Sequence, residues 1–287
     1  MDQFRLLYMG APKSGKTGSL AALANAGWTI RYIDFDANVS PLLNFTDPPN
    51  RKNIQIVRCI DNYTTRRVPG KKDNTFDEVY VYKEKPAAWT TMNDNIFKQW
   101  VVDGSNPAEW DPTKNVIVID SLSTLSQARL RLSQYTAGRE GGKRAYTDFG
   151  AAQQHIEDLL HSMKGTIMCP VIIVAHIDVI GPDLHTDDVE SDELKEALLR
   201  HKLKGAEKTP WAIGPVTVGK ALLRNLAMHF SGVVLAESSK TFGRQIHLAP
   251  RDGLGLGVPI PKMPKELPIE TGMASIMNSW VKVSRTP

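Results

Sequence analysis

Six short runs of apolar residues recur along the chain without the regular polar alternation of a half-exposed strand. They occupy residues 4–9, 28–35, 53–60, 115–120, 170–177 and 232–236. Strands that are apolar on both faces are typical of a parallel sheet that helices cover on both sides. The pattern therefore predicts a mostly parallel central sheet, with each strand buried on both faces.

Helical periodicity occupies several intervals between these runs. It is found at residues 17–26, 88–102, 121–136, 148–164 and 219–230. Strands that alternate with helices predict right-handed crossovers and an α/β architecture. Residues 244–249 are expected to pair with residues 232–236 as a C-terminal antiparallel hairpin. The expected fold class is therefore α/β, with helices on both faces of a mostly parallel sheet.

Length and proline content set the expected domain organisation. The 287 residues suit one large domain or two small ones. We expect a core at residues 1–255, with an inserted hairpin at about 61–87 and a mobile excursion at about 181–218, which is too long for a plain connector. The prolines of PIPKMPKELP predict extended chain. Residues 256–287 are thus expected to form an extension that packs on the core.

Composition and charge narrow the class of protein only a little. With 41% hydrophobic and 23% charged residues, the chain has the composition of a soluble globular protein. Its net charge of +4 permits an anionic partner without demanding one. Cys59 and Cys169 lie in apolar runs and are expected to be buried thiols in the cytoplasm. No apolar run approaches the ~20 residues that span a bilayer, so no membrane partner is expected.

The most specific motif is GAPKSGKT at residues 10–17, which matches the P-loop pattern G-x-x-x-x-G-K-[ST]. Its glycines allow successive backbone N–H groups to point at phosphate oxygens, and the following helix adds its positive end. Lys16 is expected to reach the β- and γ-phosphates, and Thr17 to supply a hydroxyl to Mg²⁺. The residues expected to bind ATP or GTP are Gly10, Ala11, Pro12, Lys13, Ser14, Gly15, Lys16, Thr17 and Gly18.

The second half of such a site is an acidic residue that helps to hold the Mg²⁺. The apolar run NVIVID supplies this residue by ending in Asp120. The next residue is Ser121, where many AAA+ ATPases place a glutamate that activates water. A general base for hydrolysis must therefore come from elsewhere. The strand predicted after the P-loop helix offers Asp34 and Asp36.

At these residues the chain resembles the RecA-like ATPases, over about residues 4–255. In RecA-type recombinases the corresponding strand ends in Ile-Asp-x-Glu, and the glutamate orients the attacking water. Ile33-Asp34-Phe35-Asp36 matches this pattern, except that Asp36 is one methylene shorter. The resemblance implies that Asp36 activates water, with Asp34 as the alternative. It also implies that His176 senses the γ-phosphate, so the expected catalytic residues are Lys16, Asp36 and His176.

The resemblance further implies two kinds of partner, single-stranded DNA and other copies of the chain in a ring or filament. Cations mixed with glycines and aromatic residues suit a single strand. The candidate DNA contacts are Arg139, Lys143, Arg144, Lys202, Lys204 and Lys208. A cation that reaches the phosphates of the next subunit is expected near the last strand, at Arg251, Arg244 or Lys240.

The leading hypothesis is a Mg²⁺-dependent ATPase that acts on single-stranded DNA. The chain looks like the compact phage-encoded RecA-like ATPases linked to recombination, annealing and replication, which would place it in the host cytoplasm. One alternative is a small-molecule or nucleotide kinase, which also needs a P-loop but usually has an arginine-rich lid. Another is a nucleotide-gated scaffold with weak hydrolysis, since the candidate base is short.

Overall fold

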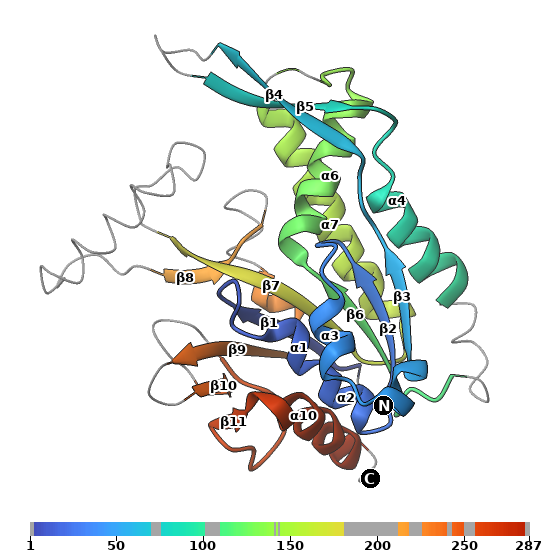
Figure 1. Cartoon of the computed structure of the whole chain (residues 1–287), viewed down its shortest axis with the longest axis vertical. Coiled ribbons are helices and arrows are strands. Elements are labelled where there is room, and N and C mark those ends of the chain that lie inside the picture. Colours follow the sequence, from blue (N-terminus) through green and yellow to red (C-terminus); the bar gives the residue numbers. More distant parts are fainter. Residues whose placement is uncertain are drawn as a thin grey trace, which may run out of the picture.

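The computed structural model describes residues 3–69, 76–100, 110–140, 142, 144–180, 212–217, 226–239, 243–249 and 256–284. Within these residues the sheet strands are β1 (Arg5–Gly10), β2 (Thr29–Asp34), β3 (Ile54–Arg58), β6 (Asn115–Asp120), β7 (Val171–Ile180), β8 (Ala212–Pro215), β9 (Gly232–Ser239), β10 (Gly243–His247) and β11 (Glu266–Pro268). They form one sheet in the order β11-β10-β9-β1-β7-β6-β2-β3, with β8 paired to β7 (Figure 1).

The predicted sheet is confirmed in its strands and in their directions. All six apolar runs become strands, and β9, β1, β7, β6, β2 and β3 pair in parallel. At the other end β9 and β10 pair antiparallel, as expected for the C-terminal hairpin. The chain is therefore an α/β protein with a large, mostly parallel central sheet.

Helices cover both faces of the sheet. One face carries α1 (Lys16–Ser19), α2 (Ala21–Asn25), α3 (Ser40–Phe45) and α10 (Ile269–Ser284); the other carries α4 (Ala88–Asn93), the π-helical η2 (Asp94–Trp100), α6 (Leu122–Thr136) and α7 (Tyr146–Thr166). Short 3₁₀ segments are η1 (Pro48–Asn53) and η3 (Leu226–His229). Along β1, Leu6 and Tyr8 pack into the first layer, whereas Leu7 and Met9 pack into the second. Burial on both faces explains why the apolar runs lack polar alternation.

Part of the expected excursion at 181–218 instead returns to the sheet. Residues 212–215 form β8, which pairs antiparallel with residues 177–180 of β7. The reason is that β7 continues past the predicted end at residue 177 and offers a further edge for pairing. Residues 181–211 and 218 lie outside the described part of the chain, as do 219–225 of the helix predicted at 219–230.

The C-terminal segment contains a helix that was not predicted. The proline-rich stretch leads into β11, and α10 follows over residues 269–284. Ile269, Met273, Ile276 and Trp280 are buried on one face of α10, which packs against α2 and β10. This spacing follows the helical period, so the signal was present in the sequence.

The insertion at about 61–87 forms the predicted hairpin, made by β4 (Tyr63–Pro69) and β5 (Phe76–Tyr82). Its tip, residues 70–75, lies outside the described residues. A buried ion pair joins the base of the hairpin to α6, with Arg131 Nε 3.0 Å from Asp61 Oδ2. The hairpin thus lies beside the C-terminal end of α6 and away from β1 (Figure 1).

Both cysteine thiols are free and buried, as predicted. Among the helices of the described residues, none combines the length and apolar character that crossing a bilayer requires.

Candidate functional site

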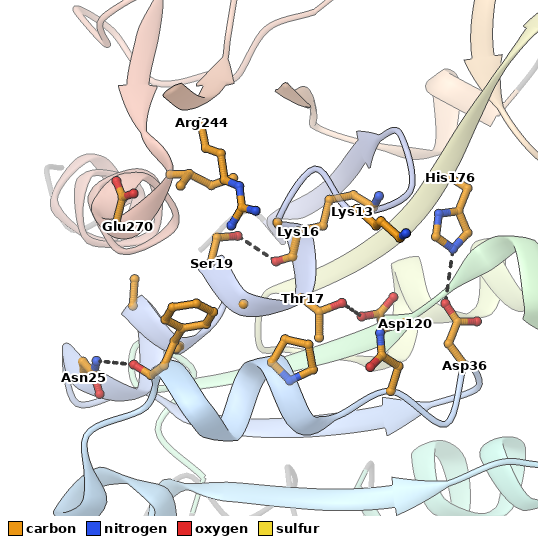
Figure 2. A pocket seen from close by; sticks show the side chains of 18 residues that line it. Lys13, Lys16, Thr17, Ser19, Asn25, Asp36, Asp120, His176, Arg244 and Glu270 are labelled. Atoms are coloured by element: carbon orange, nitrogen blue, oxygen red, sulfur yellow. Dashed lines mark hydrogen bonds and ion pairs between the residues drawn. The ribbon is translucent and has the colours of Figure 1, made fainter. Parts of the chain in front are cut away.

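Strand register brings the predicted polar residues to one edge of the sheet. Gly10 of β1 pairs with His176 of β7, and Asp34 of β2 pairs with Asp120 of β6. A cavity of about 710 Å³ opens at this edge, within the ~300–1,000 Å³ that small-molecule sites occupy. Lys16, Thr17, Asp36, Asp120 and His176 all line it (Figure 2).

The loop between β1 and α1 needs glycine at two positions. Gly15 has a φ of +97°, which an L-residue with a side chain rarely adopts. A Cβ atom at Gly10 would lie 2.6 Å from Ser14 Oγ and 2.7 Å from the carbonyl oxygen of Ala236. These glycines therefore let the chain leave β1, curl tightly and enter α1 beside β9.

Lys16 lies inside this loop with its ammonium group held by backbone. Its Nζ donates to the carbonyl oxygens of Gly10, at 2.7 Å, and Ala11, at 2.8 Å. Burial lowers the pKa of Lys16 to about 8, although the nearby carboxylates of Asp120 and Asp36 act in the opposite direction. The loop thus surrounds a buried cation whose charged form is favoured by anions nearby.

Asp120 receives two hydrogen bonds at one oxygen. Thr17 Oγ1 donates to Asp120 Oδ2 at 2.7 Å, and the Tyr32 hydroxyl donates to the same atom at 2.6 Å. Burial raises the pKa of Asp120, while these two hydrogen bonds act to lower it. Burial also raises the pKa of Tyr32, which keeps its hydroxyl a donor. Asp120 is therefore fixed beside Thr17.

Asp36 and His176, 140 positions apart in the chain, are in direct contact. His176 Nε2 lies 3.3 Å from Asp36 Oδ2, and the other carboxylate oxygen accepts hydrogen bonds from Ser121 Oγ, at 3.1 Å, and Thr124 Oγ1. Burial alone would raise the pKa of Asp36, but the hydrogen bonds from His176 and Thr124 outweigh it and lower the pKa. Asp36 is thus an oriented carboxylate at neutral pH.

Asp34, the alternative base, has a different environment. It is buried, it accepts a hydrogen bond from the Asn38 backbone N–H at 3.2 Å, and it does not line the cavity. Burial raises its pKa. Of the two carboxylates, only Asp36 faces the space where a substrate would lie, and Asp34 instead supports the turn after β2.

The oxygens of Thr17 and Asp120 suit a magnesium ion. Mg²⁺ prefers oxygen ligands, and proteins commonly hold it with one or two carboxylates, waters and substrate phosphates. Among the described residues, no group of three or more His, Cys, Asp or Glu side chains could enclose a metal alone. The residues therefore fit a Mg²⁺ that arrives with a phosphate ligand.

The structure describes three of the cations predicted to contact DNA or a neighbouring subunit. Arg244 lines the same cavity as the loop of its own chain. Arg139 forms an ion pair with Asp148, and Arg144 lies over the Tyr80 ring at 5.1 Å from its centroid. Lys143, Lys202, Lys204, Lys208, Lys240 and Arg251 lie outside the described residues.

Sequence reasoning missed several groups that shape the cavity. Tyr32 and Thr124, which orient the two carboxylates, carry no motif. Phe45 and Glu270 line the cavity from α3 and α10. An exposed aromatic residue at the end of a short helix could have drawn attention to Phe45, but only tertiary structure brings α10 to the site.

A scan against protein-family models finds no match, and a search of curated proteins finds none either. The assignment of function therefore rests on the geometry of the cavity.

Proposed function

We propose that the protein is a Mg²⁺-dependent, RecA-like ATPase. One observation carries the proposal: a P-loop lysine, an Asp–Thr pair suited to Mg²⁺ and an oriented carboxylate all face one cavity. The first two features bind a nucleoside triphosphate in P-loop proteins. The oriented carboxylate of Asp36 supplies the general base that hydrolysis needs. Ser121 cannot supply it, because a serine stands there in place of a water-activating glutamate.

In the proposed reaction, the loop amides and Lys16 bind the phosphates of ATP. Asp36 accepts a proton from a water molecule as the water oxygen bonds to the γ-phosphorus. The bond from that phosphorus to the β,γ-bridging oxygen breaks, and ADP leaves with the electron pair. His176 and Thr124 hold Asp36 in position. Thr17 and Asp120 would hold Mg²⁺, and the ion would supply positive charge that offsets the charge of the phosphates.

Release of phosphate from ATP tests this proposal, because it separates hydrolysis from transfer to another acceptor. We expect release with Mg²⁺ and a rate about 100-fold slower with EDTA, since the metal then no longer offsets part of the phosphate charge. Equal rates in both conditions would contradict the Mg²⁺ assignment. Phosphate transfer to a small acceptor in place of water would favour the kinase alternative.

The pKa of Lys16 predicts a pH dependence for ATP binding. In the free protein Lys16 loses its proton as the pH rises through about 8, whereas bound phosphates favour the ammonium form. Binding should therefore take up a proton above pH 8, and the affinity should fall by up to about tenfold per pH unit there. Calorimetric titrations between pH 7 and 9.5, in two buffers with different ionisation enthalpies, measure both effects. An affinity that stays constant to pH 9.5 would rule out this coupling.

We also propose single-stranded DNA as the macromolecular partner, in a ring or filament of identical chains. Support comes from Arg144, an exposed cation at the ring of Tyr80 between the hairpin and the region after α6. Exposed cations and aromatic rings together suit a flexible single strand. Arg139 is a weaker candidate, because Asp148 already engages its guanidinium.

Replacing Arg144 with alanine is expected to weaken DNA binding and to lower the salt slope by about 0.7, the contribution of one phosphate contact. Binding of a labelled oligonucleotide across a salt series measures the slope. The matched control is Lys164→Ala, which removes an exposed cation from the end of α7. Equal slopes for Arg144→Ala and the wild-type protein would remove Arg144 from the interface.

A further inference from the structure

Arg244 lies beside the phosphate loop of its own chain. It is in β10, which pairs with β9, and β9 in turn pairs with β1. A Cβ atom built on Gly15 would lie 3.4 Å from Arg244 Cδ and 3.8 Å from its Nε. The Arg244 side chain thus passes over the loop at the cavity wall (Figure 2).

Phe45 forms another part of the cavity wall, beside α1. Phe45 is 63% exposed, and its ring lies against Gly18, where a Cβ atom would be 2.9 Å from Phe45 Cδ2. Asn25 holds this segment in place: its Nδ2 donates to the Phe45 carbonyl at 3.2 Å, and its Oδ1 accepts from the Asp47 N–H at 2.9 Å. An exposed aromatic ring on a fixed backbone is a ready surface for stacking.

These two residues lie away from the groups that would act on the terminal phosphate. Figure 2 shows Arg244 on one side of Lys16 and Thr17, and Asp36 with His176 on the other. Asn25, which donates to the Phe45 carbonyl, also lies on the side away from Asp36. A triphosphate with its γ-phosphate near Asp36 would therefore direct its nucleoside toward Arg244 and Phe45. Both residues offer a flat, partly apolar face that suits a planar base.

We propose that Arg244 and Phe45 form the nucleoside subsite for the nucleotide bound by the same chain. This inference rests on the proposed function, and it replaces the expectation that Arg244 reaches a neighbouring subunit. The β10 strand then takes part in nucleotide binding in cis. Both side chains contribute to ATP binding by stacking on the base, and not by placing charge at the phosphates.

The test compares binding of Mg-ATP with binding of Mg-tripolyphosphate, which has the phosphates but no nucleoside. Arg244→Ala and Phe45→Ala are each expected to weaken ATP binding about 5- to 150-fold, the range for loss of one base-stacking side chain. Binding of tripolyphosphate should change less than twofold. Phe45→Trp, which keeps an aromatic face, should retain ATP binding, and Arg66→Ala on β4 is the control for loss of an exposed arginine.

The outcomes separate this inference from the proposed function. Unchanged ATP binding in Arg244→Ala and Phe45→Ala would overturn the subsite while leaving the ATPase proposal intact. An equal loss for ATP and tripolyphosphate would also overturn it, since charge would then be the cause. A wild-type protein that binds neither compound would refute both proposals.

A mixing experiment distinguishes action in cis from action in trans. The Arg244→Ala variant, which keeps Lys16, is mixed with the Lys16→Ala variant, which keeps Arg244. No chain in the mixture then has both residues. Action in cis predicts that ATP hydrolysis in the mixture equals the sum of the separate activities. Recovery well above that sum would show that Arg244 acts on a neighbouring subunit and would overturn the inference.

Discussion

Replacing Lys16 with alanine is expected to weaken ATP binding about 30- to 1,000-fold. The ammonium of Lys16 is buried and would bind the phosphates, and losing such a charged partner typically costs about 2–4 kcal/mol. Titration calorimetry with a non-hydrolysable ATP analogue and Mg²⁺ measures the affinity directly. We expect heat of binding from the wild-type protein and little or none from the variant at the same concentrations.

Lys164→Ala serves as the control for Lys16→Ala, because it removes an exposed cation that does not line the cavity. It should bind the analogue as tightly as the wild-type protein. Lys16→Ala also loses hydrogen bonds to Gly10 and Ala11, so its thermal unfolding must be checked. A folded Lys16→Ala protein with wild-type affinity would exclude the loop as the phosphate site.

Replacing Asp36 with asparagine is expected to lower the rate of ATP hydrolysis about 100- to 10,000-fold, the usual contribution of a general base. Affinity for ATP should change only a few-fold, because an amide oxygen can still accept from Ser121 and Thr124. An amide cannot take the proton from water at neutral pH. Phosphate release at saturating ATP, with affinity measured separately, distinguishes the two effects.

Asp36→Glu is the matched variant, since it keeps a carboxylate and adds one methylene. It is expected to retain at least about a tenth of the wild-type rate, because proton acceptance survives and only the geometry changes. Undiminished hydrolysis in Asp36→Asn would move the base to another residue. Loss of ATP binding in the same variant would instead assign Asp36 a structural role.

The central sheet and the tight turn between β1 and α1 could be predicted because their signals are local. Residues 10–17 are contiguous, and each buried strand is a single apolar run. Asp120 followed from its place at the end of such a run. The same local signal was present for α10, where Met273, Ile276 and Trp280 share one face, but the prolines before it directed attention to extended chain.

Contacts between distant segments could not be predicted in this way. The hydrogen bond between His176 and Asp36 depends on the register of β1, β7, β6 and β2, and on the side-chain rotamers. The proximity of Arg244 to Gly15 depends on β10 adding to β9 next to β1. Sequence placed these residues near strand ends, while tertiary pairing decided which of them meet.

A crystal structure with Mg²⁺ and a non-hydrolysable ATP analogue tests the central claim most directly. The account predicts that the β- and γ-phosphates lie within hydrogen-bonding distance of Lys16 Nζ, with the metal beside Thr17 and Asp120 and the γ-phosphate toward Asp36. An analogue bound elsewhere, with the loop at residues 10–17 free of phosphate, would contradict it.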